Sequence, residues 1–142
     1  MNYPIPSLLN FTKMVLEEIS QLVADCDAKR ENLTSHREKI NSLQKELLKF
    51  AAQSLPKDDL TDLEHYQNQF HIQLINIHDL KHDLKLFQHR VKANSHLMDD
   101  SRADVKNEYE SLLSQFDTLE KLLTDLEGDF SDFLKKPHEA VA

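Results

Sequence analysis

Apolar side chains recur along most of the chain at alternating spacings of three and four residues, which is typical of α-helices that bury one face. The pattern stops at the N-terminus, around Pro56, and from Asn94 to Ser101. Proline disfavours helical backbone in the residue before it, and serine and aspartate favour helix starts, so these interruptions mark helix ends. The predicted helices cover about residues 7–54, 59–93 and 101–134. Their expected caps are Ser7, Asp58 or Asp59, and Ser101.

Each predicted helix carries a seven-residue apolar repeat. The third helix follows it from Val105 to Phe133 without a polar residue, and the second follows it with Gln73 as its one polar member. The first helix is more polar, since Lys29 and His36 lie on its repeat. Further apolar residues beside the repeat widen the buried stripe beyond what a two-stranded coiled coil covers. These flanking residues are Leu48, Leu74, Leu86, Leu113, Leu122 and Leu134.

Wide apolar stripes and short connections predict an all-α fold: an elongated antiparallel three-helix bundle, up-down-up, with coiled-coil-like packing. It forms a single domain over residues 1–142 and leaves room for oligomerisation into a larger bundle. The first helix is longer than the other two, so its N-terminal turns project beyond them. Because the projecting residues are apolar, we expect them to bind another protein or a second copy of the chain. They are Leu8, Leu9, Phe11, Met14 and Leu16.

Composition argues against most enzyme scaffolds. The chain has one glycine, four prolines and no tryptophan. Phosphate-binding glycine loops, hairpin-rich β folds and nucleophile elbows all need residues that accept unusual backbone angles. No set of catalytic side chains converges in the pattern, so we expect neither an enzyme nor a cofactor.

The formal net charge of −8 argues against binding to nucleic acid or to anionic membranes. Residues 99–134 contain three basic and eleven acidic side chains, so the third helix holds the excess. This acidic helix is either a solvated face or a surface for a basic partner. The sequence shows no signal peptide and no apolar stretch of membrane-spanning length, and its single cysteine cannot form an internal disulfide. A cytoplasmic location is expected.

Eight histidines invite a metal-binding interpretation, because His78 and His82 are four residues apart and share one face of the second helix. They lie outside the apolar repeat, however, and no third ligand is in view. His36 on the first helix is expected near Gln73 and Ile77, where it and Gln73 could form a polar layer that fixes the pairing of the helices. Cys26 lies between two aspartates, which raise the pKa of a thiol, so it is expected to be a buried apolar residue.

These patterns predict a non-enzymatic structural or adaptor protein that binds other proteins through coiled-coil-like surfaces. The alternative is a metal-binding or metal-sensing bundle that uses the histidine-rich face of the second helix.

Overall fold

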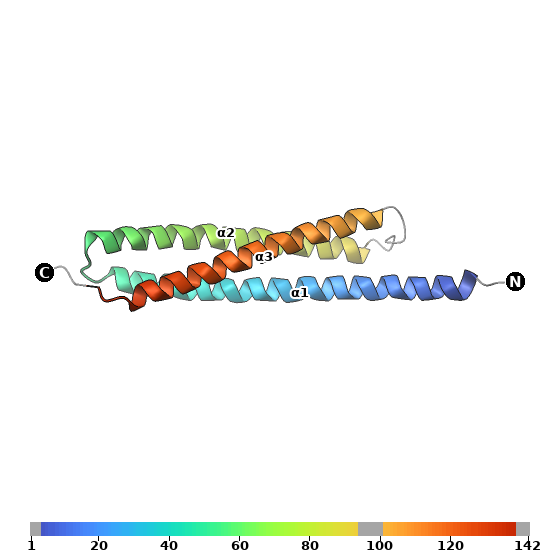
Figure 1. Ribbon diagram of the computed structural model, residues 1–142, viewed down its shortest axis with the longest axis horizontal. Helices are drawn as coiled ribbons and strands as arrows, with labels where there is room; N and C mark the ends of the chain where they lie inside the picture. Colours follow the sequence, from blue (N-terminus) through green and yellow to red (C-terminus); the bar gives the residue numbers. More distant parts are fainter. Residues whose placement is uncertain (1–3, 94–100, 139–142) are drawn as a thin grey trace.

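The chain forms three long helices that pack as an antiparallel bundle (Figure 1). The structure, a computed structural model, describes residues 4–93 and 101–138, with side chains for residues 16–93 and 103–138. Helix α1 covers Pro4–Ala51, α2 covers Lys57–Ala93, and α3 covers Ser101–Lys135. Helices α1 and α3 run in one direction and α2 runs in the other, which confirms the predicted all-α, up-down-up architecture.

The helix starts differ from the predicted caps in the first two helices. Helix α1 begins at Pro4, before Ser7. Proline is accepted in the first turn because the backbone N–H groups there have no acceptor within the helix, so the missing N–H of proline costs no helical hydrogen bond. Helix α2 begins at Lys57, and the carbonyl of Pro56 accepts the first helical hydrogen bond from Leu60. Asp58 and Asp59 thus lie within the first turn, where their charge still favours the helix dipole.

The core follows the predicted repeat closely. Its fully buried members come from all three helices and include Leu33, Ile40, Phe70, Ile77, Leu84, Leu123 and Phe130. Gln73 is buried as well. Among the residues whose side chains are described, three buried ones lie outside the predicted repeat: Leu55 in the α1–α2 connection, Gln88 and Glu127.

The flanking apolar residues divide into two groups. Leu74, Leu113 and Leu134 are partly buried, whereas Leu48, Leu86 and Leu122 are 62%, 47% and 49% exposed. The prediction that all six widen the buried stripe is therefore wrong for the second group. One helix covers only one side of a neighbour, so the residues on the outer edge of each stripe stay in water in a three-helix arrangement.

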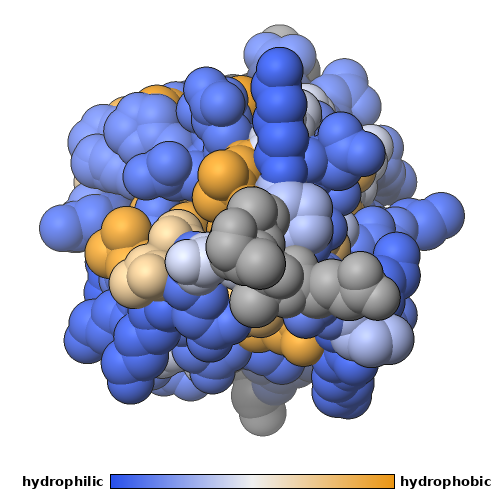
Figure 2. Space-filling view, turned by 90° about the vertical axis from the view of Figure 1, so that its left-hand side faces the viewer, coloured by the Kyte–Doolittle hydropathy of each residue, from blue (hydrophilic) through white to orange (hydrophobic). Residues whose placement is uncertain are grey.

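Aromatic side chains fill the end of the bundle at which α1 ends and α2 begins. Phe130 lies 5.0 Å from Phe70 and 5.1 Å from Tyr66 between ring centroids, and Phe133 lies 5.8 Å from Phe50. The surface of this end is mostly hydrophilic, with apolar side chains in small separate areas (Figure 2). The three helices are thus joined by a buried aromatic cluster at this end.

Candidate functional site

Helix α1 continues past the ends of both α2 and α3 (Figure 1). The side chain of Gln88, in the second-last turn of α2, contacts the backbone of Val23, so α2 ends beside this part of α1. Ile19 is partly buried against the core, and Cys26 is the first fully buried residue among the described side chains of α1, which begin at residue 16. We call residues 4–18 the N-terminal overhang.

The overhang contains all five predicted partner-binding residues. Leu16 is 58% exposed. Leu8, Leu9, Phe11 and Met14 lie on the helix, but their side chains lie outside the described residues. The structure therefore gives the helical backbone of this segment and one exposed leucine.

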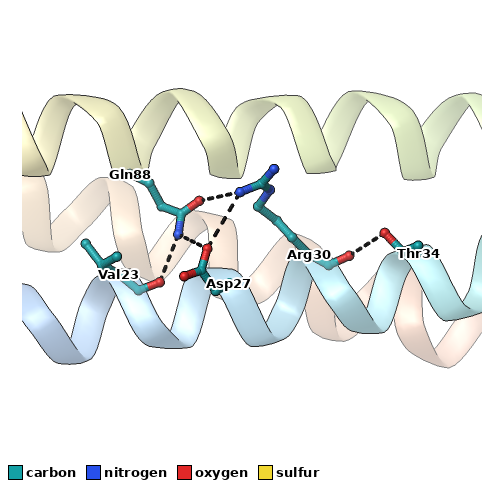
Figure 3. A network of polar contacts seen from close by, with 5 residues as sticks. All are labelled: Val23, Asp27, Arg30, Thr34 and Gln88. Carbon is teal, nitrogen blue, oxygen red and sulfur yellow. Dashed lines mark hydrogen bonds and ion pairs between the residues drawn. The ribbon is translucent and has the colours of Figure 1, made fainter.

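A polar network lies in the α1–α2 interface near the C-terminal end of α2 (Figure 3). Gln88 is 4% exposed, and its Nε2 donates to the carbonyl of Val23 at 2.8 Å and to Oδ1 of Asp27 at 2.7 Å. Its Oε1 accepts a hydrogen bond of 3.0 Å from Arg30, which also lies 3.6 Å from Asp27. These contacts fix the register of α2 along α1 near the C-terminal end of α2.

The sequence pattern missed Gln88 because it looks like an ordinary polar neighbour of Phe87. The signal that could have found it is the hairpin register, which sets residues near 88 opposite residues near 25 and so opposite Asp27 and Arg30.

Helix α3 joins the same region through Tyr109. Its hydroxyl donates to Asp25 of α1, and its ring stacks on Phe87 with centroids 5.7 Å apart. Burial, then the hydrogen bond to Asp25, raises the pKa of Tyr109. Neighbouring Cys26 is fully buried, and its burial followed by the charges of Asp25 and Asp27 raises its pKa from 9.0 to about 11. Cys26 is therefore protonated near neutral pH and unsuited to nucleophilic chemistry, as the sequence predicted.

His36 bonds with a residue that the sequence pattern did not assign to it. Its Nδ1 lies 2.8 Å from Oε2 of Glu127, which is buried, while Gln73 accepts a hydrogen bond from Asn76 instead. His36 and Gln73 therefore each bond with another residue, and the polar layer that the two would form together stays a prediction. Glu127 follows the apolar repeat of α3 by one residue and so faces α1, which brings its carboxylate to His36.

The five histidines of α2 are all exposed, including the metal candidates His78 and His82. Among the described residues, no group of three or more histidine, cysteine, aspartate or glutamate side chains is arranged to hold a metal ion. Within the same part of the chain, no helix is long and apolar enough to cross a membrane.

A scan of known protein-family models and searches of curated proteins and of solved structures each found no match for this chain.

Proposed function

We propose that the chain is a non-enzymatic helical adaptor that binds a partner protein, or a second copy of itself, through the N-terminal overhang of α1. The observation that carries the proposal is the extension of α1 beyond α2 and α3, with Leu16 exposed on the extended part (Figure 1). Contiguous apolar surface on a helix is typical of interaction sites, since covering it removes apolar area from water. A partner helix that lies along the overhang would continue the coiled-coil-like packing of the bundle.

The negative net charge supports a protein partner over nucleic acid or an anionic membrane. The single cysteine, which is buried and unpaired, supports a cytoplasmic location as part of the proposal.

The test is a double substitution to serine at Phe11 and Met14. If the overhang is an interface, the variant should lose one of two properties of the full chain. These are self-association, measured by sedimentation, and capture of a partner protein, measured by cross-linking. Its melting temperature should stay within about 2 °C of the parent, because substitutions away from buried features usually change stability by less than about 0.5 kcal/mol.

The matched control is Leu48→Ser, which removes an exposed leucine near the other end of the same helix. It should leave association unchanged. A fall in stability of about 2–5 kcal/mol in the double variant, with association intact, would instead identify Phe11 and Met14 as core residues and refute the proposal.

A further inference from the structure

A long groove runs along the outside of the bundle between α2 and α3. Two adjoining hollows form it and share Asp83 and Gln115 in their linings. Together they extend over residues 76–90 of α2 and 108–122 of α3. At 1.5 Å per residue each wall is about 21 Å long, which matches about four turns of a docked helix. The groove is thus longer than a small-molecule site requires.

Both walls of this groove leave apolar side chains in contact with water. Leu86 on α2 and Leu122 on α3 are each about half exposed. The buried residues Leu80, Leu112 and Leu119 also line it. A helix that placed an apolar stripe over these residues would cover Leu86 and Leu122 and turn the three-helix packing into a four-helix one.

The polar lining of the groove is acidic. Asp79 and Asp83 are exposed, and neither forms an ion pair with any described residue. Arg90 is the one cation in the described lining, and it is already paired with Glu108. Two carboxylates therefore remain without a counter-charge beside the apolar stripe, which favours an occupant with positive side chains.

Three cations, Lys81 of α2 with Arg30 and Arg37 of α1, lie on the opposite side of α2, together with the acidic Glu38. Lys81 lies on the α1 side of α2, where burial and then the charges of Arg37 and Arg30 lower its pKa. Neighbouring cations repel a basic helix from that side, while Asp79 and Asp83 attract it to the groove. The overhang of a second copy carries Lys13 but also Glu17 and Glu18, so its charge does not match the groove.

We infer that the groove between α2 and α3 binds an amphipathic helix of a partner protein, with an apolar stripe flanked by lysine or arginine. The inference rests on the proposed adaptor function, to which it adds a second surface and a chemical class of partner.

The test uses two synthetic 15-residue helical peptides with the same leucine stripe, one flanked by lysines and the other by glutamates. Binding of each labelled peptide to the full chain is measured by fluorescence anisotropy. We expect the lysine peptide to bind and the glutamate peptide not to bind. Asp79→Asn combined with Asp83→Asn should lower the affinity for the lysine peptide about five- to tenfold. Leu122→Ser should lower that affinity about threefold.

Matched controls distinguish binding in the groove from the effect of net charge and from nonspecific hydrophobic binding. Glu31→Gln combined with Glu46→Gln changes the net charge equally on exposed positions of α1, and Leu48→Ser removes an exposed leucine elsewhere. The inference is overturned if the lysine peptide does not bind. It is also overturned if the control variants lower the affinity for this peptide as much as the groove variants do. It is equally overturned if only the Phe11 and Met14 variant weakens binding.

Loss of self-association in the Asp79 and Asp83 variant would assign the groove to a second copy and would also contradict the inference. The groove variants leave residues 4–18 unchanged, so failure here is distinguishable from failure of the proposed role of the overhang.

Discussion

Replacing Gln88 with alanine tests whether the buried polar network sets the pairing of α1 and α2. The substitution removes three hydrogen bonds, to Val23, Asp27 and Arg30. Each such bond contributes about 0.5–1.5 kcal/mol. Asp27 and Arg30 are partly exposed, so water replaces part of the loss, and we expect a net destabilisation of about 2 kcal/mol.

The expected shift in melting temperature follows from the size of the chain. An unfolding entropy of about 2.1 cal/mol/K per residue gives about 0.3 kcal/mol/K for a chain of this length, so 2 kcal/mol corresponds to about 7 °C. The assay is thermal and urea unfolding followed by circular dichroism. Gln67→Ala is the matched control, because Gln67 precedes Gln88 by three heptads on the same helix and is exposed.

Both alanine substitutions change the helix propensity equally. The difference between the stability losses of the two variants therefore gives the contribution of the polar network. A double-mutant cycle of Gln88→Ala with Asp27→Ala should show a coupling of about 0.5 kcal/mol or more. Equal effects of Gln88→Ala and Gln67→Ala would refute the reasoning, because they would mean that the network adds nothing to stability.

Three further predictions concern a thiol, a glycine and the histidines. Because Cys26 keeps its proton up to a pKa of about 11 in the folded chain and only to 9.0 when unfolded, stability should fall as the pH rises from about 9 toward 11. Urea midpoints should show this fall, and Cys26→Ala should reduce it most clearly between pH 9 and 10, below the range in which Tyr109, whose pKa is raised from 10.0, also contributes. Gly128→Ala should stabilise α3 by about 1 kcal/mol in urea unfolding, since an added Cβ would meet no atom within 4 Å and helices favour alanine over glycine. A chelator should change the melting temperature by less than about 1 °C, because His78 and His82 are exposed and no third ligand joins them among the described residues. A large fall would promote the metal-binding alternative.

The fold could be predicted because it depends on spacing. The apolar repeat from Leu63 to Val91 and the one from Val105 to Phe133 fix which face of each helix is covered, and Pro56 fixes the first turn. The spacing also placed His78 and His82 outside the repeat, and both are exposed.

The polar contacts could not be predicted as well, because they depend on residues one step off the repeat. Glu127 and Gln88 each follow an apolar repeat position, and only the relative placement of two helices decides whether such a residue meets a partner or water. His36 illustrates this, since the sequence pattern placed it near Gln73 of α2 whereas its bonding partner comes from α3. The exposure of Leu86 and Leu122 has the same origin.

The central claim is that the N-terminal overhang of α1 serves as a binding surface for a partner protein or for a second copy of the chain. Hydrogen exchange measured by mass spectrometry tests it most directly, at a concentration where sedimentation shows a monomer. The account predicts that amides of the overhang exchange much faster than those of residues 26–50 in the monomer, since an unpacked helix of this length is marginal in water, and that they become protected when the chain associates. Protection in the monomer equal to that of residues 26–50 would contradict the account, because it would show that the overhang is already packed within the chain.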